Sequence, residues 1–318
     1  MDTQKLDTAA TDTAAKDRTW LVALAAALWG TDALLRKPLA DRLPAAAVVF
    51  WEHVIALFVL LPWLPDALRA FRRLSGRERA AVVVVGVGAS ALATALFTQA
   101  FAIGDPVTPL VLQKFQPVFA ILAAHVLLGE RLRRGYLWFA LPALAGAWLL
   151  TFPNPLQVSV TAAWSALLAL GAAALWAGGT VLGRLVSGRL TPHQLTVLRY
   201  FFGFLGATAI VAITGAPLTV RWGDVLGLVL LALVPGLLAL SLYYVGLRTT
   251  PAARATLAEL TFPATAALIG VTLLGAQLTA SQWIGLVVIV AAVTGLGWHE
   301  RRTPKPVVAA PLVEPISG

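Results

Sequence analysis

Long runs of apolar residues, separated by short polar connections, make up most of this chain. Each run approaches the length of about 20 residues that an α-helix needs to cross the hydrocarbon core of a bilayer. The tightest connections carry proline at or near the first turn of the following helix, at Pro106 and Pro251. The pattern predicts ten transmembrane helices, at residues 19–35, 45–65, 80–103, 106–129, 134–152, 160–183, 192–214, 222–247, 251–275 and 280–299.

The two halves of this pattern share short sequences at a nearly constant spacing. Ala-Ala-Leu-Trp occupies residues 26–29 and 173–176, 147 positions apart, and Leu-Leu-Gly occupies residues 127–129 and 273–275, 146 positions apart. A repeat of five helices is odd in number, so the second copy enters the membrane from the opposite side. Inverted repeats of membrane helices are typical of secondary transporters that bind their solute between the halves. We therefore predict an all-α membrane protein with two inverted five-helix repeats, at residues 19–152 and 160–299.

Composition and charge agree with a protein that is dissolved in lipid. Hydrophobic residues form 59% of the chain and charged residues 12%, against about 45–50% and about 25% in soluble domains. Eighteen of the 24 Lys and Arg residues fall on the side of the N-terminus, which the positive-inside rule assigns to the cytoplasm. The connection that contains Arg36 and Arg42 is expected on the outer side. We expect an inner-membrane protein with disordered cytoplasmic tails at 1–18 and 303–318, and no nucleic-acid partner.

The residue inventory argues against several kinds of chemistry. Cysteine is absent, which excludes disulfides, zinc clusters and thiol catalysis. The four histidines are scattered without the spacing of metal ligands, and the sequence has no phosphate-binding Walker loop. We therefore expect no metal, no cofactor and no enzymatic activity.

Several short motifs at matched positions carry a family resemblance. Ala-Leu-Trp-Gly at 27–30 recurs as Ala-Leu-Trp at 174–176, and Pro-Val-Phe at 117–119 leads to Leu-Leu-Gly-Glu at 127–130. With these motifs and ten apolar segments, the chain resembles the EamA family of the drug/metabolite transporter superfamily over residues 19–299. The second copy keeps Leu-Leu-Gly but lacks the glutamate. The resemblance implies a transporter of amino acids, metabolites or cationic drugs, commonly in the outward direction.

Ionisable residues inside apolar segments are the first candidates for a solute pathway, because each costs about 2.5–3.5 kcal/mol to insert. Glu52 and Arg199 lie at equivalent depths, 147 positions apart. The family that the chain resembles often carries arginine at both positions. An ion pair between them would serve either as a gate or substrate clamp, or as a structural pair that fixes helix packing. The sequence leaves both interpretations open.

A second pair of equivalent positions, 146 residues apart, consists of Gln113 and Glu259. Desolvation favours the protonated form of a membrane-embedded carboxyl group. Glu259 is therefore the main candidate for proton coupling, and Glu52 is the second. Lys114 lies within the same apolar segment as Gln113. It would hold a solute carboxylate or neutralise Glu52 or Glu259.

Aromatic and polar residues at similar depths complete the expected binding site. Aromatic walls suit organic solutes, including cationic ones, although plain packing is an equal alternative for each ring. Asp32 is expected at a solvated outer interface, and His53 and His125 are expected in packed or interfacial positions. The predicted substrate-binding residues are Trp29, Glu52, Gln99, Gln113, Lys114, Trp176, Arg199, Tyr243 and Tyr244, with Glu259 and Glu52 for proton coupling.

These features favour secondary transport by alternating access, in which helix bundles rock around a central site. We expect proton-coupled export of a small organic metabolite, an amino acid or similar zwitterion, because a lysine and an arginine face two carboxylates. An exporter of drugs and quaternary cations is the alternative. An intramembrane enzyme and a non-transporting membrane receptor are rivals from other classes. Surfaces that face lipid and surfaces that face a second copy look alike in sequence, so monomer and homodimer both remain open.

Overall fold

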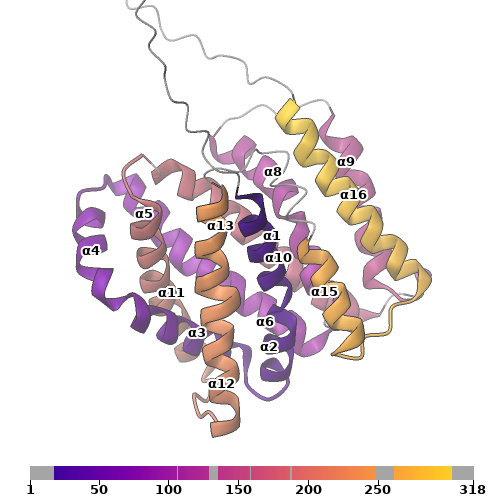
Figure 1. Cartoon of the computed structure of the whole chain (residues 1–318), viewed down its shortest axis with the longest axis horizontal. Coiled ribbons are helices and arrows are strands. Elements are labelled where there is room, and N and C mark those ends of the chain that lie inside the picture. The colour runs from indigo at the N-terminus through magenta and orange to yellow at the C-terminus, as the bar shows by residue number, and fades with distance from the viewer. Residues whose placement is uncertain are drawn as a thin grey trace, which may run out of the picture.

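The computed structural model describes residues 18–105, 107–128, 135–157, 159–186, 188–247 and 261–302, and all regular secondary structure in these ranges is helical (Figure 1). The expected tails lie almost wholly outside these ranges. Within these described ranges, five helices are long and apolar enough to cross a membrane. The number of ten spans and the inversion of the repeats remain predictions. The five are Ala45–Arg72, Gly76–Ile103, Val160–Gly183, Pro192–Thr214 and Trp222–Tyr243, and shorter apolar helices lie at Leu137–Thr151 and Ala280–Ala292.

The first half begins with a broken helix. At Thr31 the hydroxyl and the backbone amide both donate to the carbonyl of Leu28, and the helix resumes at Asp32. It continues beyond the expected end at residue 35, because the acidic first turn of the second piece pairs with Arg36 one turn later. The elements of this half are α1 (Thr19–Gly30), α2 (Asp32–Ala40), α3 (Ala45–Leu60), η1 (Leu61–Trp63), α4 (Leu64–Arg72), α5 (Gly76–Val84), η2 (Val85–Leu92), α6 (Ala93–Ile103), α7 (Thr108–Leu112), η3 (Gln113–Phe115), α8 (Gln116–Leu128) and α9 (Tyr136–Thr151).

Prolines and capping residues set the ends of several helices. Pro62 and Pro65 lie in the first turns of η1 and α4, where proline's missing N–H is not needed, so α3 runs on into α4. Ser75 and Glu78 form a capping box that begins α5, and Thr191 begins α11 in the same way. The elements of the second half are α10 (Val160–Val186), α11 (Pro192–Thr214), α12 (Trp222–Leu231), η4 (Ala232–Leu238), α13 (Ala239–Leu247), α15 (Thr261–Thr272) and α16 (Ala280–Arg302).

Helices of the two halves pack against one another instead of forming separate bundles. α11 packs against α3 and η2, α1 packs against α13 and α15, and α10 packs against α6 and α8. α9 and α16 run side by side at one end of the molecule (Figure 1). Gly146 and Gly285 face each other there, and a Cβ atom on Gly285 would lie 2.6 Å from the carbonyl oxygen of Gly146. These glycines therefore allow the two helix backbones to come into direct contact.

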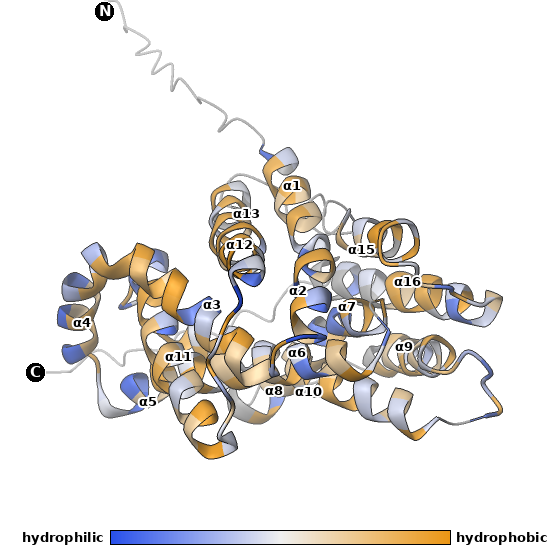
Figure 2. Cartoon of the chain, turned by 90° about the horizontal axis from the view of Figure 1, so that it is seen from below, coloured by the Kyte–Doolittle hydropathy of each residue, from blue (hydrophilic) through white to orange (hydrophobic). Residues whose placement is uncertain are grey.

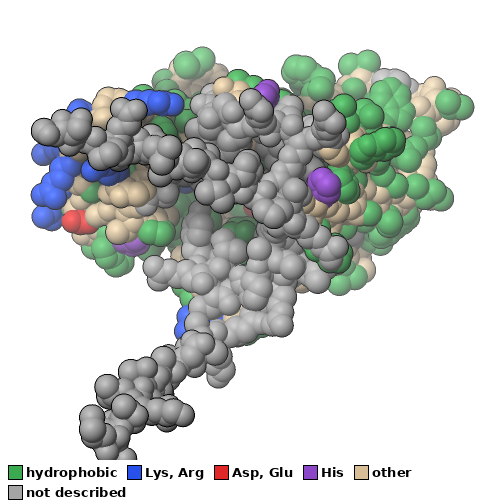
Figure 3. Space-filling view, turned by 90° about the horizontal axis from the view of Figure 1, so that it is seen from above, with side chains coloured by type: hydrophobic (Ala, Val, Ile, Leu, Met, Phe, Trp, Pro, Cys, Tyr) green, Lys and Arg blue, Asp and Glu red, His purple; other side chains and the backbone are tan. Residues whose placement is uncertain are grey.

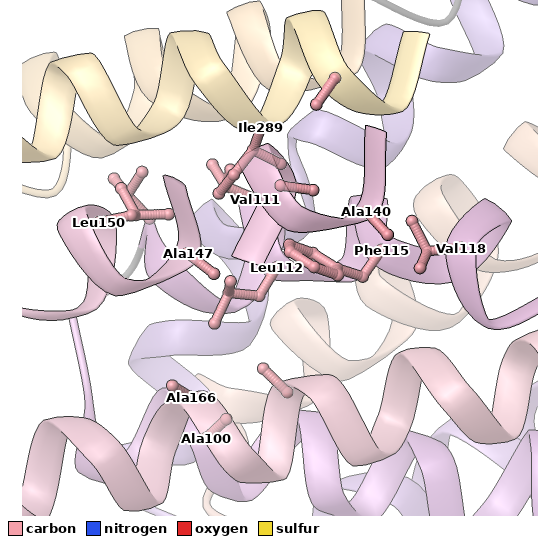
Figure 4. Close-up of a cluster of buried hydrophobic side chains, with 14 residues drawn as sticks. Ala100, Val111, Leu112, Phe115, Val118, Ala140, Ala147, Leu150, Ala166 and Ile289 are labelled. Atoms are coloured by element: carbon pink, nitrogen blue, oxygen red, sulfur yellow. The ribbon is translucent and has the colours of Figure 1, made fainter. Parts of the chain in front are cut away.

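A cluster of buried apolar side chains joins α7, η3, α9, α10 and α16 (Figure 4). Val111, Leu112, Phe115, Leu150 and Ile289 have no exposed surface in it. Many large apolar side chains are exposed on the described helices, among them Phe58, Trp138 and Leu226. The helices α4 and α5 carry hydrophilic residues (Figure 2). Such extensive exposed apolar surface suits contact with lipid.

Candidate solute site and its charged network

A buried guanidinium group, that of Arg36, lies at the centre of a polar network. Its Nε and Nη2 donate to the carboxylate oxygens of Asp32, at 2.7 and 2.9 Å. Its Nη1 and Nη2 donate to those of Glu52, at 2.8 and 2.9 Å, and Nη1 also donates to Thr98 Oγ1 at 2.7 Å. These bonds use all five N–H donors of a guanidinium. Arg36 therefore has no donor left for another partner.

Three helices supply this network. Asp32 and Arg36 lie one turn apart on α2, Glu52 comes from α3, and Thr98 comes from α6. The two carboxylate residues are each 8% exposed and Arg36 is 4% exposed. The guanidinium carbon also lies 5.7 Å from the centroid of the Phe97 ring. The network consequently ties together three helices of the first half in a poorly hydrated place.

The position of this network corrects two expectations. Arg36 was assigned to an outer connection and Asp32 to a solvated interface, and both are buried. Those assignments were wrong about burial because these charged side chains pair with one another, which a hydropathy pattern does not show. Glu52 is buried inside α3 as expected, but within the described residues its ion-pair partner is Arg36 and not Arg199. With all three groups ionised, the network holds one negative charge in excess.

Arg199 instead contacts an irregular part of another helix. Its Nη2 donates to the carbonyl oxygen of Ala89 at 3.3 Å, within η2, which is a π-helical stretch. A π-helical turn is wider than an α-turn and displaces carbonyls from their usual i+4 partners. The carbonyl of Ala89 can therefore accept a hydrogen bond from α11.

The same stretch holds His53 in a defined tautomer. His53 Nδ1 lies 2.8 Å from the carbonyl oxygen of Val49, and Nε2 lies 2.9 Å from Ser90 Oγ. A carbonyl only accepts, so Nδ1 carries a proton, and in a neutral ring the Ser90 hydroxyl donates to Nε2. Gly203 of α11 packs against this ring, where a Cβ atom would lie 2.5 Å from His53 Cδ2. His53 is thus the packed histidine that the sequence suggested.

A second π-helical stretch lies in the other half. η4 begins at Ala232, 147 positions after the first residue of η2, Val85. This is the spacing of the repeated Ala-Ala-Leu-Trp sequence. η4 contains the buried Pro235, and η2 contains Gly86, whose Cβ would lie 2.3 Å from Phe202 Cβ. π-helical turns are frequent at functional sites, which makes the two stretches candidates for moving parts.

Aromatic pairs lie where helices of the two halves meet. Trp29 of α1 packs on Tyr243 of α13 with ring centroids 5.0 Å apart, and Trp176 of α10 packs on Phe97 of α6 with centroids 5.1 Å apart. The two tryptophans occupy equivalent places in the repeated sequence. Both are half-buried, so part of each indole remains open to another molecule. Phe97 also contacts the guanidinium of Arg36, which links the aromatic pair to the charged network.

The remaining predicted residues are more dispersed. Lys114 is half-buried in η3, with its ammonium nitrogen 4.1 Å from the centroid of the Phe262 ring. Gln113 is half-buried beside it, and Gln99 is exposed on α6. The site expected at Glu259 and at the side chain of Tyr244 lies outside the described residues.

Sequence reasoning missed four residues of the site: Asp32, Arg36, Phe97 and Thr98. The spacing of Asp32 and Arg36 was an available signal, because residues four apart on a helix pair readily. Phe97 and Thr98 carried none, since an aromatic ring and a hydroxyl are ordinary in an apolar helix.

Helices from two related halves that meet around polar and aromatic residues inside a membrane define a transporter-like fold. The chain matches the model of the EamA-like transporter family over residues 19–152 and 163–298. It therefore belongs to this family, and it is a membrane transporter and not an enzyme.

The chain is similar to two transporters and to one solved structure. It is 32% identical to the riboflavin transporter ImpX of Fusobacterium nucleatum over 255 residues, which cover 76% of this chain and 85% of that protein. It is 29% identical to the uncharacterized transporter YwfM of Bacillus subtilis over 174 residues, which cover 54% of this chain and 57% of that protein. A solved crystal structure with 20% identity matches 91% of this chain and 100% of its own, with a TM-score of 0.60. The last comparison supports the fold alone.

Proposed function

We propose that this transporter carries a small organic solute with a flat ring system, of the riboflavin class, across the inner membrane. The observation that carries the proposal is the pair of half-buried tryptophans, Trp29 and Trp176, at contacts between the halves. Aromatic contacts of this kind contribute about 0.5–1.5 kcal/mol each beyond the area that they bury. The name of the 32% identical relative, a riboflavin transporter, points to the same chemistry.

The charged network around Arg36 does not offer a site for the carboxylate of an amino acid. A zwitterion needs a cation for its carboxylate, and every donor of Arg36 is already in use. Releasing a partner would leave Asp32 or Glu52 buried and unpaired, which costs about 3–5 kcal/mol. Lys114 lies outside this network, with its ammonium nitrogen 4.1 Å from the centroid of the Phe262 ring.

Alternating access between inverted repeats is the mechanism that we propose. Helix contacts support this mechanism. At the repeat spacing α1 corresponds to α10 and α6 corresponds to α13, and the contact of α1 with α13 is the counterpart of the contact of α10 with α6. The π-helical stretches η2 and η4 support it as well, because their first residues are 147 positions apart, as are the repeated Ala-Ala-Leu-Trp sequences. Both stretches have irregular backbone bonding, so each helix can bend there while bundles rock around the aromatic pairs.

Proton coupling is part of the proposal and rests on charge. Two carboxylates share one guanidinium, so one added proton would make the network of Asp32, Arg36 and Glu52 neutral. Glu259 remains a further candidate for this role. The same excess charge favours a cation, which makes a quaternary-cation exporter the second candidate function.

Transport by the purified protein in liposomes tests these proposals. Radiolabelled riboflavin, an amino-acid mixture and tetraphenylphosphonium are supplied in parallel, with and without a pH gradient, and loading from either side gives the direction. We expect riboflavin to move outward, and Trp29→Ala or Trp176→Ala to slow it about tenfold. Trp138→Ala is the matched control, because Trp138 is 81% exposed on α9. Movement of amino acids or tetraphenylphosphonium in place of riboflavin would refute the solute class. Equal rates in all three tryptophan variants would refute the site.

A further inference from the structure

A concentrated patch of positive charge lies at one edge of the molecule, over α4 and α5 (Figure 3). The patch consists of exposed arginines within eleven consecutive residues: Arg69, Arg72, Arg73, Arg77 and Arg79. The two acidic residues nearby are engaged elsewhere. Asp66 accepts from Gln194 at 2.8 Å, and Glu78 caps α5 and lies 3.7 Å from Arg189. Five arginines therefore stand beside two carboxylates, and the patch keeps a net positive charge.

The backbone beneath the patch is fixed by apolar packing. Ala67 and Leu74 are buried, and the Phe71 ring lies 5.0 Å from that of Phe202 on α11. Arg69 Nε donates to the carbonyl of Pro65 at 3.2 Å, which holds that side chain along α4. The arginines thus project from a helix surface that is packed against α11. Arg72, Arg73 and Arg77 form no ion pair with the residues that the structure describes.

Helix length places the patch at a defined depth in the membrane. The helical runs Ala45–Arg72 and Gly76–Ile103 each contain 28 residues, whereas about 20 residues are enough to cross a hydrocarbon core about 30 Å thick. About 20 residues cross that core, so the run from Ala45 leaves it near Leu64 and the antiparallel run leaves it near Val84. The arginines then lie roughly 7–13 Å beyond the hydrocarbon edge, within reach of phosphate groups in the headgroup layer.

Apolar side chains lie directly below the patch, on the hydrocarbon side. Phe58 is 73% exposed, and Val59, Leu61 and Trp63 are between 43% and 48% exposed. Trp63 falls at the expected hydrocarbon edge, where aromatic residues anchor membrane helices. A ligand that matches both surfaces carries a phosphate and long acyl chains.

We propose that the arginine patch is a binding site for the headgroup of an anionic phospholipid, such as phosphatidylglycerol, in the adjacent leaflet. Basic clusters next to a membrane helix attract anionic lipid with about 1 kcal/mol per Lys or Arg, which corresponds to roughly fivefold in affinity for each residue. The apolar surface beneath the arginines distinguishes a lipid from a free phosphate or from nucleic acid. The site does not depend on which solute the protein carries.

Native mass spectrometry of the full chain in detergent tests the proposal. Phosphatidylglycerol and phosphatidylcholine with the same acyl chains are titrated separately, beside glycerol phosphate and a short RNA. We expect phosphatidylglycerol to bind at least tenfold more tightly than phosphatidylcholine, with an affinity that falls as salt rises. The triple change Arg72→Gln, Arg73→Gln and Arg77→Gln should weaken its binding about a hundredfold. The corresponding triple change to lysine should keep most of the affinity.

The control variant is Arg221→Gln, which removes an exposed charge at the start of α12 and should leave lipid binding unchanged. Equal binding of the two lipids by the unaltered protein would overturn the proposal, and this comparison needs no variant to fold. So would unchanged binding in the triple glutamine variant. Glycerol phosphate binding as tightly as the lipid would indicate a free-anion site, and tighter binding of RNA would indicate a nucleic-acid surface. Either result overturns the lipid assignment.

Discussion

Replacing Arg36 with alanine leaves the carboxylates of Asp32 and Glu52 facing each other without their shared partner. Both groups accept two hydrogen bonds from the guanidinium, at distances between 2.7 and 2.9 Å. Each residue is 8% exposed, so water cannot fully replace those bonds. The variant must therefore protonate a carboxyl group, open the contact between α2 and α3, or lose stability.

The size of the effect follows from burial. Breaking a buried ion pair by removing one partner costs about 3–5 kcal/mol. At about 2.1 cal/mol/K per residue, a chain of 318 residues has an unfolding entropy of about 0.7 kcal/mol/K, so 1 kcal/mol lowers Tm by about 1.5 °C and we expect a fall of about 5–8 °C. Lysine at this position restores the charge but supplies three donors in place of five, and it cannot form two bidentate pairs. Arg36→Lys should therefore give a smaller fall than Arg36→Ala.

Thermal unfolding of the purified protein, followed in one detergent for all variants, measures these shifts. Lys37→Ala is the control, because the ion pair of Lys37 with Asp41 is partly exposed and such pairs contribute about 0–1 kcal/mol. If Arg36→Ala and Lys37→Ala shift Tm equally, the network does not stabilise the fold as its geometry indicates. A variant Arg36→Ala that unfolds normally and still transports would refute the reasoning altogether.

Three further predictions use the same unfolding measurement. Gly285→Ala should lower the free energy of unfolding by about 1–3 kcal/mol, because the new Cβ would lie 2.6 Å from a carbonyl oxygen of α9. Gly178→Ala is its control, and it should raise the free energy of unfolding by about 0.5–1 kcal/mol because nothing lies within 4 Å of the new Cβ. Equal effects of the two changes would argue against close packing of α9 on α16. Ser90→Ala should cost about 1–3 kcal/mol, because it leaves Nε2 of the buried His53 without its donor, and the exposed Ser241→Ala is its control. Thr191→Ala should cost about 1 kcal/mol by removing the cap of α11, and no change would mean that the cap is not needed.

Helix positions were predictable from the apolar pattern because the penalty for an exposed polar backbone in lipid is large. The run expected at 192–214 is α11, Pro192–Thr214, and the run expected at 160–183 is α10, which extends to Val186. The family, and with it transport, was predictable from short motifs placed at matched offsets. These features depend on hydrophobicity and spacing, which the sequence states directly.

The partners of the buried charges were not predictable in the same way. Glu52 and Arg199 lie at equivalent depths, but depth along a helix does not say which face a side chain occupies. Glu52 points to α2 and Arg199 points to η2. Arg36 was misplaced because hydropathy scores each residue alone, whereas the insertion penalty of a charge falls when its neighbours complete its hydrogen bonds. The π-helical stretches contain glycine and proline, but these residues also occur in regular helices of this chain, so they do not predict a π-helical turn.

His53 and Tyr200 are also 147 positions apart, and their rings contact each other with centroids separated by 5.6 Å. Under the predicted inverted-repeat symmetry, a position that touches its own counterpart would lie close to the axis that relates the two halves. Two identical half-chains joined around such an axis would have to place the same side chain on both sides of this contact. Joining the halves in one polypeptide removes that restriction, so one ring can hydrogen bond to Ser90 while the other differs from it chemically. The contact between His53 and Tyr200 is therefore chemically asymmetric, which the same contact in a dimer of identical repeats could not be.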